Sequence, residues 1–326
     1  MKKMCTAITY KTKDVYFGRT LDIECSFGEE VIVTPRNFAL DFRHMEEEKS
    51  RYAMIGIGTV REGYPLYYDA ANEHGLGMAG LNFPTNACYL EPKEGKENVS
   101  PFEFIPYVLG QCKSVSEARE CLSQVNLCNT SFGVNLPLSP LHWMIADKDG
   151  CIVVEGLADG LHIYENPVGV LTNNPPFPYH LLHLCDYMTL SSEPPVARLG
   201  KDFLTPYSRG MGALGLPGDF SSASRFVRAA FVRENAVSNT DEVASVSQFF
   251  HILGSVEHVR GCVILDGGKY EITAYTSCMN LSRGICYYTT YENRAISAVS
   301  LSGCDLEERE LCRFPLQTEQ QIVWQD

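Results

Sequence analysis

The sequence has little positive charge and no long apolar run, and each absence excludes a class of protein. Its 27 Lys and Arg against 40 Asp and Glu give a formal net charge of −13. That balance argues against nucleic acid or an anionic membrane as a partner, because both bind basic surfaces. No stretch approaches the roughly 18 apolar residues of a membrane-spanning helix, and no apolar signal core follows the first residues. We therefore expect a soluble, cytoplasmic protein.

The common metal and redox motifs are also missing. The 13 cysteines are scattered, and none forms the Cys-x-x-Cys pair typical of zinc sites and thioredoxin-like motifs. Their odd number and wide spacing also argue against a disulfide framework, so most are expected to be buried, reduced thiols. The eight histidines include no HExxH motif.

Two glycine patterns, at residues 75–80 and 210–215, match GxGxxG. A dinucleotide site needs a helix to begin at these glycines, so that its first amides face the pyrophosphate. Pro84 and Pro217 follow within a few residues and no helical pattern begins, so we expect neither to bind a nucleotide. A G-x-S-x-G elbow and a Walker loop are absent as well.

The rest of the chain indicates antiparallel strands joined by short turns, with helices in pairs. The helical segments are expected at 101–125, where Ser114 begins a capping box, and at 179–188, 224–235 and 241–253. Gly267–Gly268 is the predicted turn of a last hairpin over 262–277. The other strands are expected at 5–10, 15–22, 30–35, 52–60, 66–71, 75–83, 141–147, 151–157, 160–166, 168–173 and 284–292. This pattern predicts an α+β fold with two antiparallel sheets between helical layers.

One domain is expected over residues 5–326. The segment 191–222 is long, rich in Pro and Gly, and without periodicity. Strand-forming segments lie on both sides of it, so we interpret it as a long loop within one domain rather than as a linker.

Cys5 is the residue whose position raises a chemical question, because it follows Met4. If translation begins at Met4, or if residues 1–4 are removed, Cys5 gains a free α-amine. Reference pKa values of about 8.5 for the thiol and about 7.7–8.0 for the amine are close enough for easy proton transfer. The ordinary alternative is that Cys5 is a small, buried hydrophobe in a first strand.

Six segments in order resemble the choloylglycine hydrolases, the family of bile salt hydrolases and penicillin V acylases. The resemblance covers about residues 4–300, and six matches in order are far more specific than any one motif. The segments are MCTAITYKTKDVYFGRTLDIE, ANEHGLGMAGLNFP, LHWMIADKDGCIVVE, GVLTNNPPFPYH, GDFSSASRFVRAAF and LGSVEHV.

The resemblance implies an N-terminal-nucleophile hydrolase with an αββα sandwich and Cys5 as nucleophile. Arg19 matches the arginine beside the thiol, where a guanidinium is expected to favour thiolate, and Asp22 matches the aspartate that binds the α-amine. A hairpin brings both back toward Cys5. The remaining matches are Asn82 and Asn173, which hold the substrate and the oxyanion, and Arg225, with Arg228 one turn later as the alternative arginine.

The implied reaction is amide hydrolysis through a thioester on Cys5, with the α-amine as base and with no metal or cofactor. Asn82 favours a conjugated bile salt as the small-molecule substrate, because penicillin acylases usually have tyrosine there. Phe27, Phe83 and Tyr10 are candidates for a sterol-sized pocket. The resemblance also implies a homotetramer, with the 191–222 loop reaching a neighbouring subunit. A rival hypothesis is a non-catalytic bile acid or lipid binder that retains its first residues.

Overall fold

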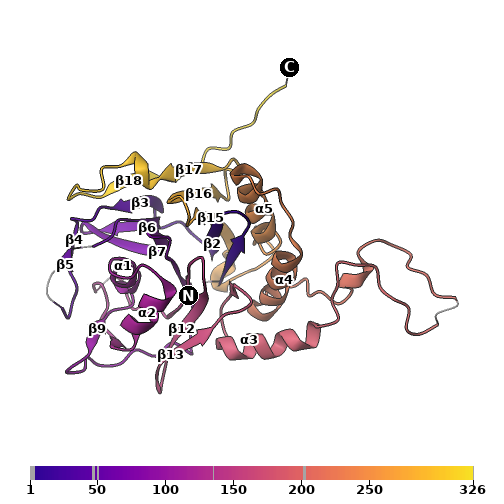
Figure 1. Cartoon of the computed structure of the whole chain (residues 1–326), viewed down its shortest axis with the longest axis horizontal. Coiled ribbons are helices and arrows are strands. Elements are labelled where there is room, and N and C mark those ends of the chain that lie inside the picture. Colours follow the sequence, from indigo (N-terminus) through magenta and orange to yellow (C-terminus); the bar gives the residue numbers. More distant parts are fainter. Residues whose placement is uncertain (1–3, 46–47, 50, 135, 201–202, 326) are drawn as a thin grey trace.

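Two antiparallel sheets lie face to face between layers of helices in the computed structural model, which describes residues 4–45, 48–49, 51–134, 136–200 and 203–325. Figure 1 shows the four layers in order: helices α1 and α2, the eight-stranded sheet, the six-stranded sheet, and helices α4 and α5. The predicted αββα arrangement is confirmed.

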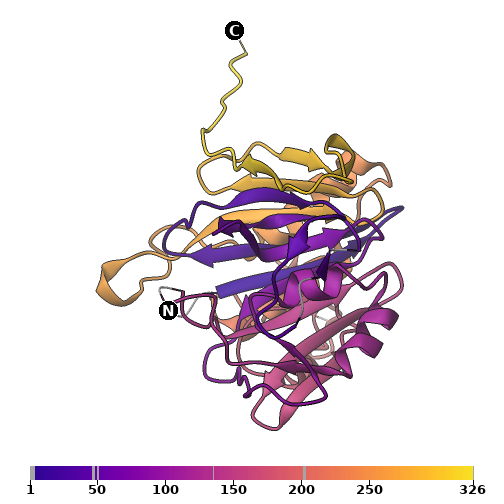
Figure 2. The same cartoon turned by 90° about the vertical axis from the view of Figure 1, so that its left-hand side faces the viewer.

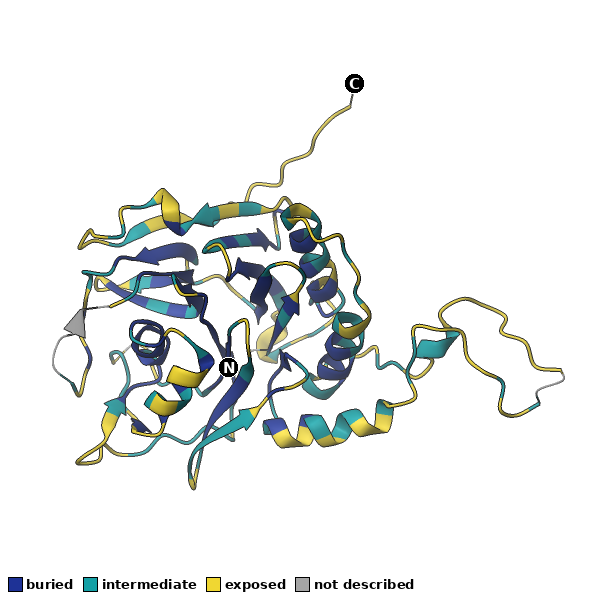
Figure 3. Ribbon diagram, viewed as in Figure 1, coloured by how far each residue is buried: buried dark blue, intermediate teal, exposed yellow. Residues whose placement is uncertain are grey.

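The six-stranded sheet has the order β14-β1-β2-β15-β16-β17 and carries the N-terminal end of the described chain. Its central strands are buried along most of their length, as expected for a sheet covered on both faces (Figure 3). The strands are β1 (Met4–Lys11), β2 (Val15–Ile23), β14 (Val170–Leu171), β15 (Ile272–Asn280), β16 (Ile285–Thr290) and β17 (Ser297–Ser300).

The eight-stranded sheet has the order β13-β12-β11-β8-β7-β6-β3-β18. Its strands are β3 (Glu30–Thr34), β6 (Met54–Arg61), β7 (Tyr64–Asn72), β8 (Gly77–Asn82), β11 (Leu141–Ala146), β12 (Cys151–Leu157), β13 (Gly160–Glu165) and β18 (Cys312–Pro315). Two minor sheets pair β9 (Glu97–Val99) with β10 (Val125–Leu127) and β4 (Ala39–Leu40) with β5 (Glu48–Lys49).

The helices cover the outer faces of the sheets. Helices α1 (Phe104–Leu109) and α2 (Val115–Leu122) lie on the eight-stranded sheet, and α4 (Ser222–Asn235) and α5 (Glu242–Gly254) on the six-stranded one (Figure 1). Helix α3 (Phe177–Leu184) follows β14 and packs on α4. Short 3-10 helices occur at Cys185–Tyr187, Met211–Ala213, Asp266–Gly268 and Leu301–Gly303.

Alternation along the strands divides the apolar side chains between two cores. Val31 and Val33 face the core between the sheets, whereas Ile32 between them faces the core beneath α1 and α2. This period of two lets the eight-stranded sheet serve both cores at once, because neighbouring side chains point to opposite faces. Figure 2 shows the same strands from the side.

The first hairpin places the N-terminal cysteine against β2. Cys5 lies opposite Leu21, and Ala7 lies opposite Arg19. The neighbouring pair is Met4 and Asp22. The sequence predicted this return of β2 toward Cys5, and the register confirms it.

Two expected strands differ from the structure. The hairpin predicted over 262–277 turns at Gly267–Gly268 as expected, but its first arm makes a single bridge, from Ile264 to Tyr270, and does not form a strand. Residues 261–269 are largely exposed. The strand predicted over 168–173 is limited to Val170–Leu171, since the side chain of Asn166 bonds the turn before it.

The segment 191–222 projects away from the body of the molecule (Figure 1). Outside residues 201–202, which the structure does not describe, its regular elements are the short turn Met211–Ala213 and the first residue of α4. Its role in assembly stays a prediction. Of the glycine patterns, residues 75–80 run into strand β8 and residues 210–215 into that short turn, so neither begins a helix that could hold a pyrophosphate.

Among the helices described, none has the length and apolarity needed to cross a membrane. The longest, α4, has 14 residues.

Gly18 is the position at which the central strands approach too closely for a side chain. A Cβ atom there would lie 2.1 Å from the Ser277 carbonyl oxygen of β15. We expect Gly18→Ala to lower the free energy of unfolding by about 2–3 kcal/mol, because backbone atoms must move. Thermal unfolding measures this, with Gly254→Ala as control, since a Cβ at Gly254 meets nothing within 4 Å. Equal melting temperatures for the two variants would contradict the packing argument.

Candidate active site

Cys5 lies at the start of β1, between the two sheets, and its side chain is 2% exposed. Its backbone N–H donates to Asn173 Oδ1 at 2.9 Å. The N–H of Met4 donates to Glu271 Oε1 at 2.8 Å. Residues 1–3, part of the expected leader, lie outside the described residues. The chain entering Cys5 is thus held by one amide and one carboxylate.

The guanidinium of Arg19 touches the thiol directly. Its Nη2 donates to Cys5 Sγ, and its Nη1 donates to the carbonyl oxygens of Gly80 and Tyr68. Its Nε donates to the Thr20 carbonyl at 3.1 Å. Because Gly80 and Tyr68 belong to the eight-stranded sheet, this side chain connects the two sheets behind the thiol.

Asp22 is buried near the C-terminal end of β2, opposite Met4. Its carboxylate accepts hydrogen bonds from Thr273 Oγ1 at 2.6 Å and Thr20 Oγ1 at 3.0 Å. Burial raises the pKa of Asp22 to about 6, and the nearby charge of Arg225 opposes the shift. In this form of the chain the N–H of Cys5 is bonded to Asn173 rather than to Asp22.

Asn173 is the polar hub of the site. Its Oδ1 accepts from Cys5 N and from Arg225 Nη2 at 2.7 Å, while its Nδ2 donates to the Asn82 carbonyl at 2.7 Å. Arg225 also donates from Nη1 to the Cys5 carbonyl and to Thr6 Oγ1, both at 2.6 Å. The structure therefore brings together all six residues that the sequence singled out.

Arg228 occupies a different place although it follows Arg225 by one turn of α4. Its guanidinium is bonded to the carbonyls of Ser255, Pro217 and Asp219, so it fastens loops around the helix. Arg225 is fully buried beside Cys5, whereas Arg228 is part-buried and makes none of these bonds to Cys5.

Arg19 favours the thiolate of Cys5, as expected, but burial has the larger effect. Burial raises the pKa of Cys5 above its ordinary value, and the charge of Arg19 partly opposes this. Desolvation of a fully buried thiolate thus outweighs one nearby cation.

Sequence reasoning missed the backbone groups and the supporting residues of the site. The backbone N–H groups of Asn82 and Asp22 also hydrogen-bond to the Cys5 thiol. The N–H of Asn173 donates to Ser222 Oγ at 2.9 Å. Backbone donors have no residue signature, so no motif identifies them in advance.

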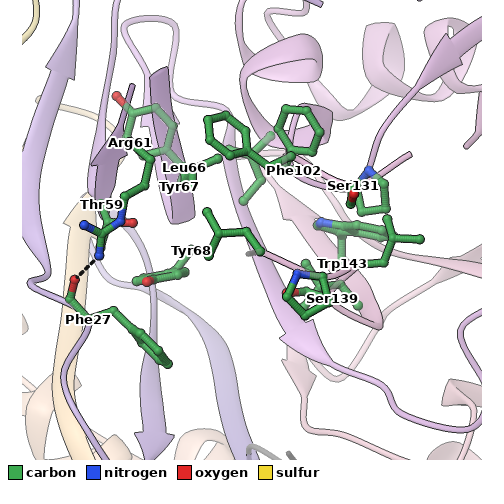
Figure 4. A pocket seen from close by; sticks show the side chains of 17 residues that line it. Phe27, Thr59, Arg61, Leu66, Tyr67, Tyr68, Phe102, Ser131, Ser139 and Trp143 are labelled. Atoms are coloured by element: carbon green, nitrogen blue, oxygen red, sulfur yellow. Dashed lines mark hydrogen bonds between the residues drawn. The ribbon is translucent and has the colours of Figure 1, made fainter. Parts of the chain in front are cut away.

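An apolar pocket lies against the eight-stranded sheet (Figure 4). Two of its lining residues contact neighbours of Cys5: the carbonyl of Tyr68 accepts from Arg19, and Leu141 pairs with Asn82 across the sheet. Other lining residues include Phe27, Arg61, Leu66, Phe102, Phe132, Leu138 and Trp143.

Of the three aromatic residues proposed for a sterol pocket, Phe27 lines it, and its carbonyl accepts from Arg61 at 2.9 Å (Figure 4). The expectation was wrong for the other two. Phe83 is fully buried and stacks on His142, while Tyr10 lies at a separate hollow on the surface.

In the described parts of the chain, no three His, Cys, Asp or Glu side chains converge in a way that could hold a metal ion. The chemistry available at this site is therefore that of a thiol, its flanking amides, two arginines and a carboxylate.

The fold is that of the N-terminal-nucleophile hydrolases. A penicillin V acylase from Agrobacterium tumefaciens, 20% identical, shares the fold with a TM-score of 0.76 over 98% of this chain and 94% of its own. A conjugated bile acid hydrolase from Clostridium perfringens, 38% identical, gives a TM-score of 0.93 over 99% and 100% of the two chains.

The model of the linear amide C–N hydrolases, choloylglycine hydrolase family, matches residues 5–314. A relative named bile salt hydrolase/transferase, from Lactiplantibacillus plantarum, is 52% identical over 98% of each chain. The chain therefore belongs to the choloylglycine hydrolase family and is an amide hydrolase. The resemblance stated from the sequence is confirmed.

Arg19 offers a test of the electrostatics around the thiol. We expect Arg19→Gln to raise the pKa of Cys5 and to slow its alkylation near neutral pH by at least about tenfold, because the thiolate is the nucleophile and one pKa unit is a factor of ten. The loss should shrink as pH rises. The measurement is the rate of iodoacetamide labelling against pH.

Peptide mass spectrometry is needed to separate Cys5 from the exposed Cys25, Cys185 and Cys262. Arg313→Gln is a suitable control, since Arg313 pairs with Glu30 at the edge strand β18. An unchanged pH profile for Arg19→Gln would show that its guanidinium does not favour the thiolate.

Proposed function

We propose that this protein hydrolyses the amide bond of glycine- or taurine-conjugated bile salts with Cys5 as the nucleophile. The observation that carries the proposal is that Arg19 holds the thiol of Cys5 and Asn173 holds its nitrogen, while Tyr68, a carbonyl partner of Arg19, lines an apolar pocket. A conjugated bile salt has an apolar steroid body, which suits such a pocket, and an amide at the end of its side chain.

The mechanism requires a chain that begins at Cys5, and we propose that residues 1–4 are absent from the mature enzyme. Its α-amine then accepts the thiol proton, and the thiolate attacks the amide carbonyl. The C–N bond breaks as the amine returns the proton to the departing glycine or taurine, which leaves a thioester on Cys5. Water, deprotonated by the same amine, releases the bile acid and restores the thiol.

Each polar neighbour has a part in this scheme. Asp22 holds the α-amine, and Arg19 stabilises the thiolate. An amide group has two N–H donors, so Asn173 can bond the Asn82 carbonyl and still donate to an oxyanion. The backbone N–H of Asn82, already directed at the thiol, is a second donor at the same place. Donors of this kind are typically worth about 10²–10³ in rate each.

The names of similar proteins support a conjugated bile salt as the substrate. Those named bile salt hydrolase/transferase and conjugated bile acid hydrolase share 40–52% of their residues with this chain. Asn82 also favours a bile salt as the substrate, because it stands where penicillin acylases usually have tyrosine. Penicillin V, another acyl amide, is the alternative substrate.

The deciding measurement is glycine release from glycocholate together with the intact mass of the purified protein. We expect a mass that begins at Cys5 and a single fast alkylation that abolishes release. Cys5→Ser should lose at least about 10³-fold in kcat, because a hydroxyl with a far higher pKa is a poor nucleophile at neutral pH. Penicillin V is assayed in parallel.

The rival binder predicts the opposite results. If residues 1–4 remain, no substrate is cleaved and glycocholate still protects the protein against thermal unfolding, then the chain binds bile acids without hydrolysing them. Activity that persists in Cys5→Ser would sink the nucleophile assignment.

The two arginines of α4 provide a matched pair for the site. We expect Arg225→Gln to lower kcat by at least about 10²-fold, since it removes a buried charge that holds the Cys5 carbonyl and Asn173. Arg228→Gln should retain most activity, because its bonds reach only loop carbonyls. Steady-state kinetics on glycocholate compares them. The reverse order of losses would assign the role to Arg228.

A further inference from the structure

A fully buried histidine–glutamate pair that the mechanism does not use lies beside both asparagines of the site. His142 is in β11 and Glu155 in β12, next to each other in the eight-stranded sheet. His142 Nδ1 is 3.0 Å from Glu155 Oε1. Two ionisable groups with no exposure are expensive to bury, so their presence needs an explanation.

The other ring nitrogen of His142 reaches the opposite sheet. Nε2 lies 2.9 Å from the carbonyl oxygen of Thr172, the residue before Asn173. The imidazole also stacks on Phe83, the residue after Asn82, with ring centres 4.2 Å apart and planes 3° from parallel. A single side chain therefore contacts the neighbours of both asparagines.

Glu155 extends this contact to helix α3. Its Oε1 also accepts from the N–H of Phe177, the first residue of α3, at 3.0 Å. From the same helix, His180 bonds the carbonyl of Asn173 through Nε2 at 2.9 Å. His142 thus holds the carbonyl of Thr172, and His180 holds the carbonyl of Asn173. Glu155 holds the first residue of α3, the helix that carries His180.

The hydrogen positions follow from the partners. A carbonyl oxygen only accepts, so Nε2 of His142 carries the hydrogen of its bond to Thr172. Glu155 Oε1 is the partner of Nδ1, and this contact orients the imidazole ring so that Nε2 is directed at the Thr172 carbonyl.

We propose that His142 and Glu155 are positioning residues that fix the relative positions of Asn82 and Asn173. This inference rests on the proposed function, in which those two residues provide the donors for substrate and oxyanion. Asn82 ends β8 of the eight-stranded sheet, Asn173 follows β14 of the six-stranded sheet, and one direct hydrogen bond from Asn173 Nδ2 to the Asn82 carbonyl joins them. The bridge through His142 adds a second directional contact, which holds the backbone beside Asn173 and the ring beside Asn82.

Glu155→Gln is the sharpest variant, because it preserves volume but cannot satisfy every partner of the carboxylate. If the amide oxygen keeps the Phe177 N–H, it accepts from the imidazole tautomer whose one hydrogen is on Nδ1, which leaves Nε2 with none for Thr172. If the amide is flipped, its NH₂ group donates to Nδ1 but faces the Phe177 N–H, and the bond to helix α3 is lost. His142→Leu removes both bonds at once.

The experiment compares mature wild-type enzyme with Glu155→Gln and His142→Leu, using glycocholate kinetics, Cys5 alkylation by iodoacetamide and thermal unfolding. We expect kcat and kcat/KM to fall together by at least about tenfold in Glu155→Gln, approaching about 10²-fold if the asparagine moves by ~1 Å. The Cys5 alkylation rate should fall far less than kcat, because Arg19 contacts the thiol directly and neither His142 nor Glu155 holds Arg19.

His162→Asn is the matched control, since His162 also pairs with a carboxylate, Asp159 at 2.8 Å, but on the partly exposed edge strand β13. It should match the wild type in every measurement. A folded Glu155→Gln with wild-type kcat, or a parallel fall of hydrolysis and alkylation, would overturn the positioning role. If His142→Leu fails to fold, Glu155→Gln decides alone. A wild type that releases no glycine would instead overturn the proposed function, and this inference with it.

Discussion

The buried guanidinium of Arg19 is the interaction on which the rest of the site depends. A cation with 1% exposure is tolerated only if its donors are satisfied, and here they are taken by Cys5 Sγ and by carbonyls from both sheets. The same bonds that compensate for its desolvation fix the distance between the sheets at the thiol. Stability and chemistry therefore share one side chain.

The His142–Glu155 pair is the polar counterpart of Arg19 on the other side of the gap between the sheets. Arg19 extends from the six-stranded sheet to carbonyls of the eight-stranded one, and His142 extends in the opposite direction to Thr172. Two face-to-face sheets held by apolar contacts alone have no fixed offset. With a directional bond on each side of Cys5, the offset is set where the reaction takes place.

Sequence reasoning succeeded where the signal was local and failed where it was long-range. Strand alternation and a polar turn were enough to bring Arg19 and Asp22 toward Cys5, and the family resemblance supplied the other positions. The choice of Arg225 over Arg228 was open in the sequence, because both lie on one face of the helix, and the contacts with Asn173 and Cys5 emerge only in three dimensions. The turn of the 262–277 hairpin was predicted from Gly267–Gly268, but the pattern did not show that the first arm forms one bridge instead of a strand.

The form of the chain described here explains why a thiol so well surrounded is still not an activated one. With Met4 attached, the nitrogen of Cys5 is an amide that cannot accept a proton, and burial raises the pKa of the thiol above its ordinary value. Removing Met4 turns the Cys5 nitrogen into an amine, which is a base within reach of the thiol. Once protonated, the same amine is a cation that favours the thiolate. The acceptors for that cation already exist, since Asn173 Oδ1 faces the nitrogen and the Asp22 carboxylate lies across the hairpin. In the proposed mechanism, removal of residues 1–4 therefore adds a free α-amine to side chains that the fold has already brought together.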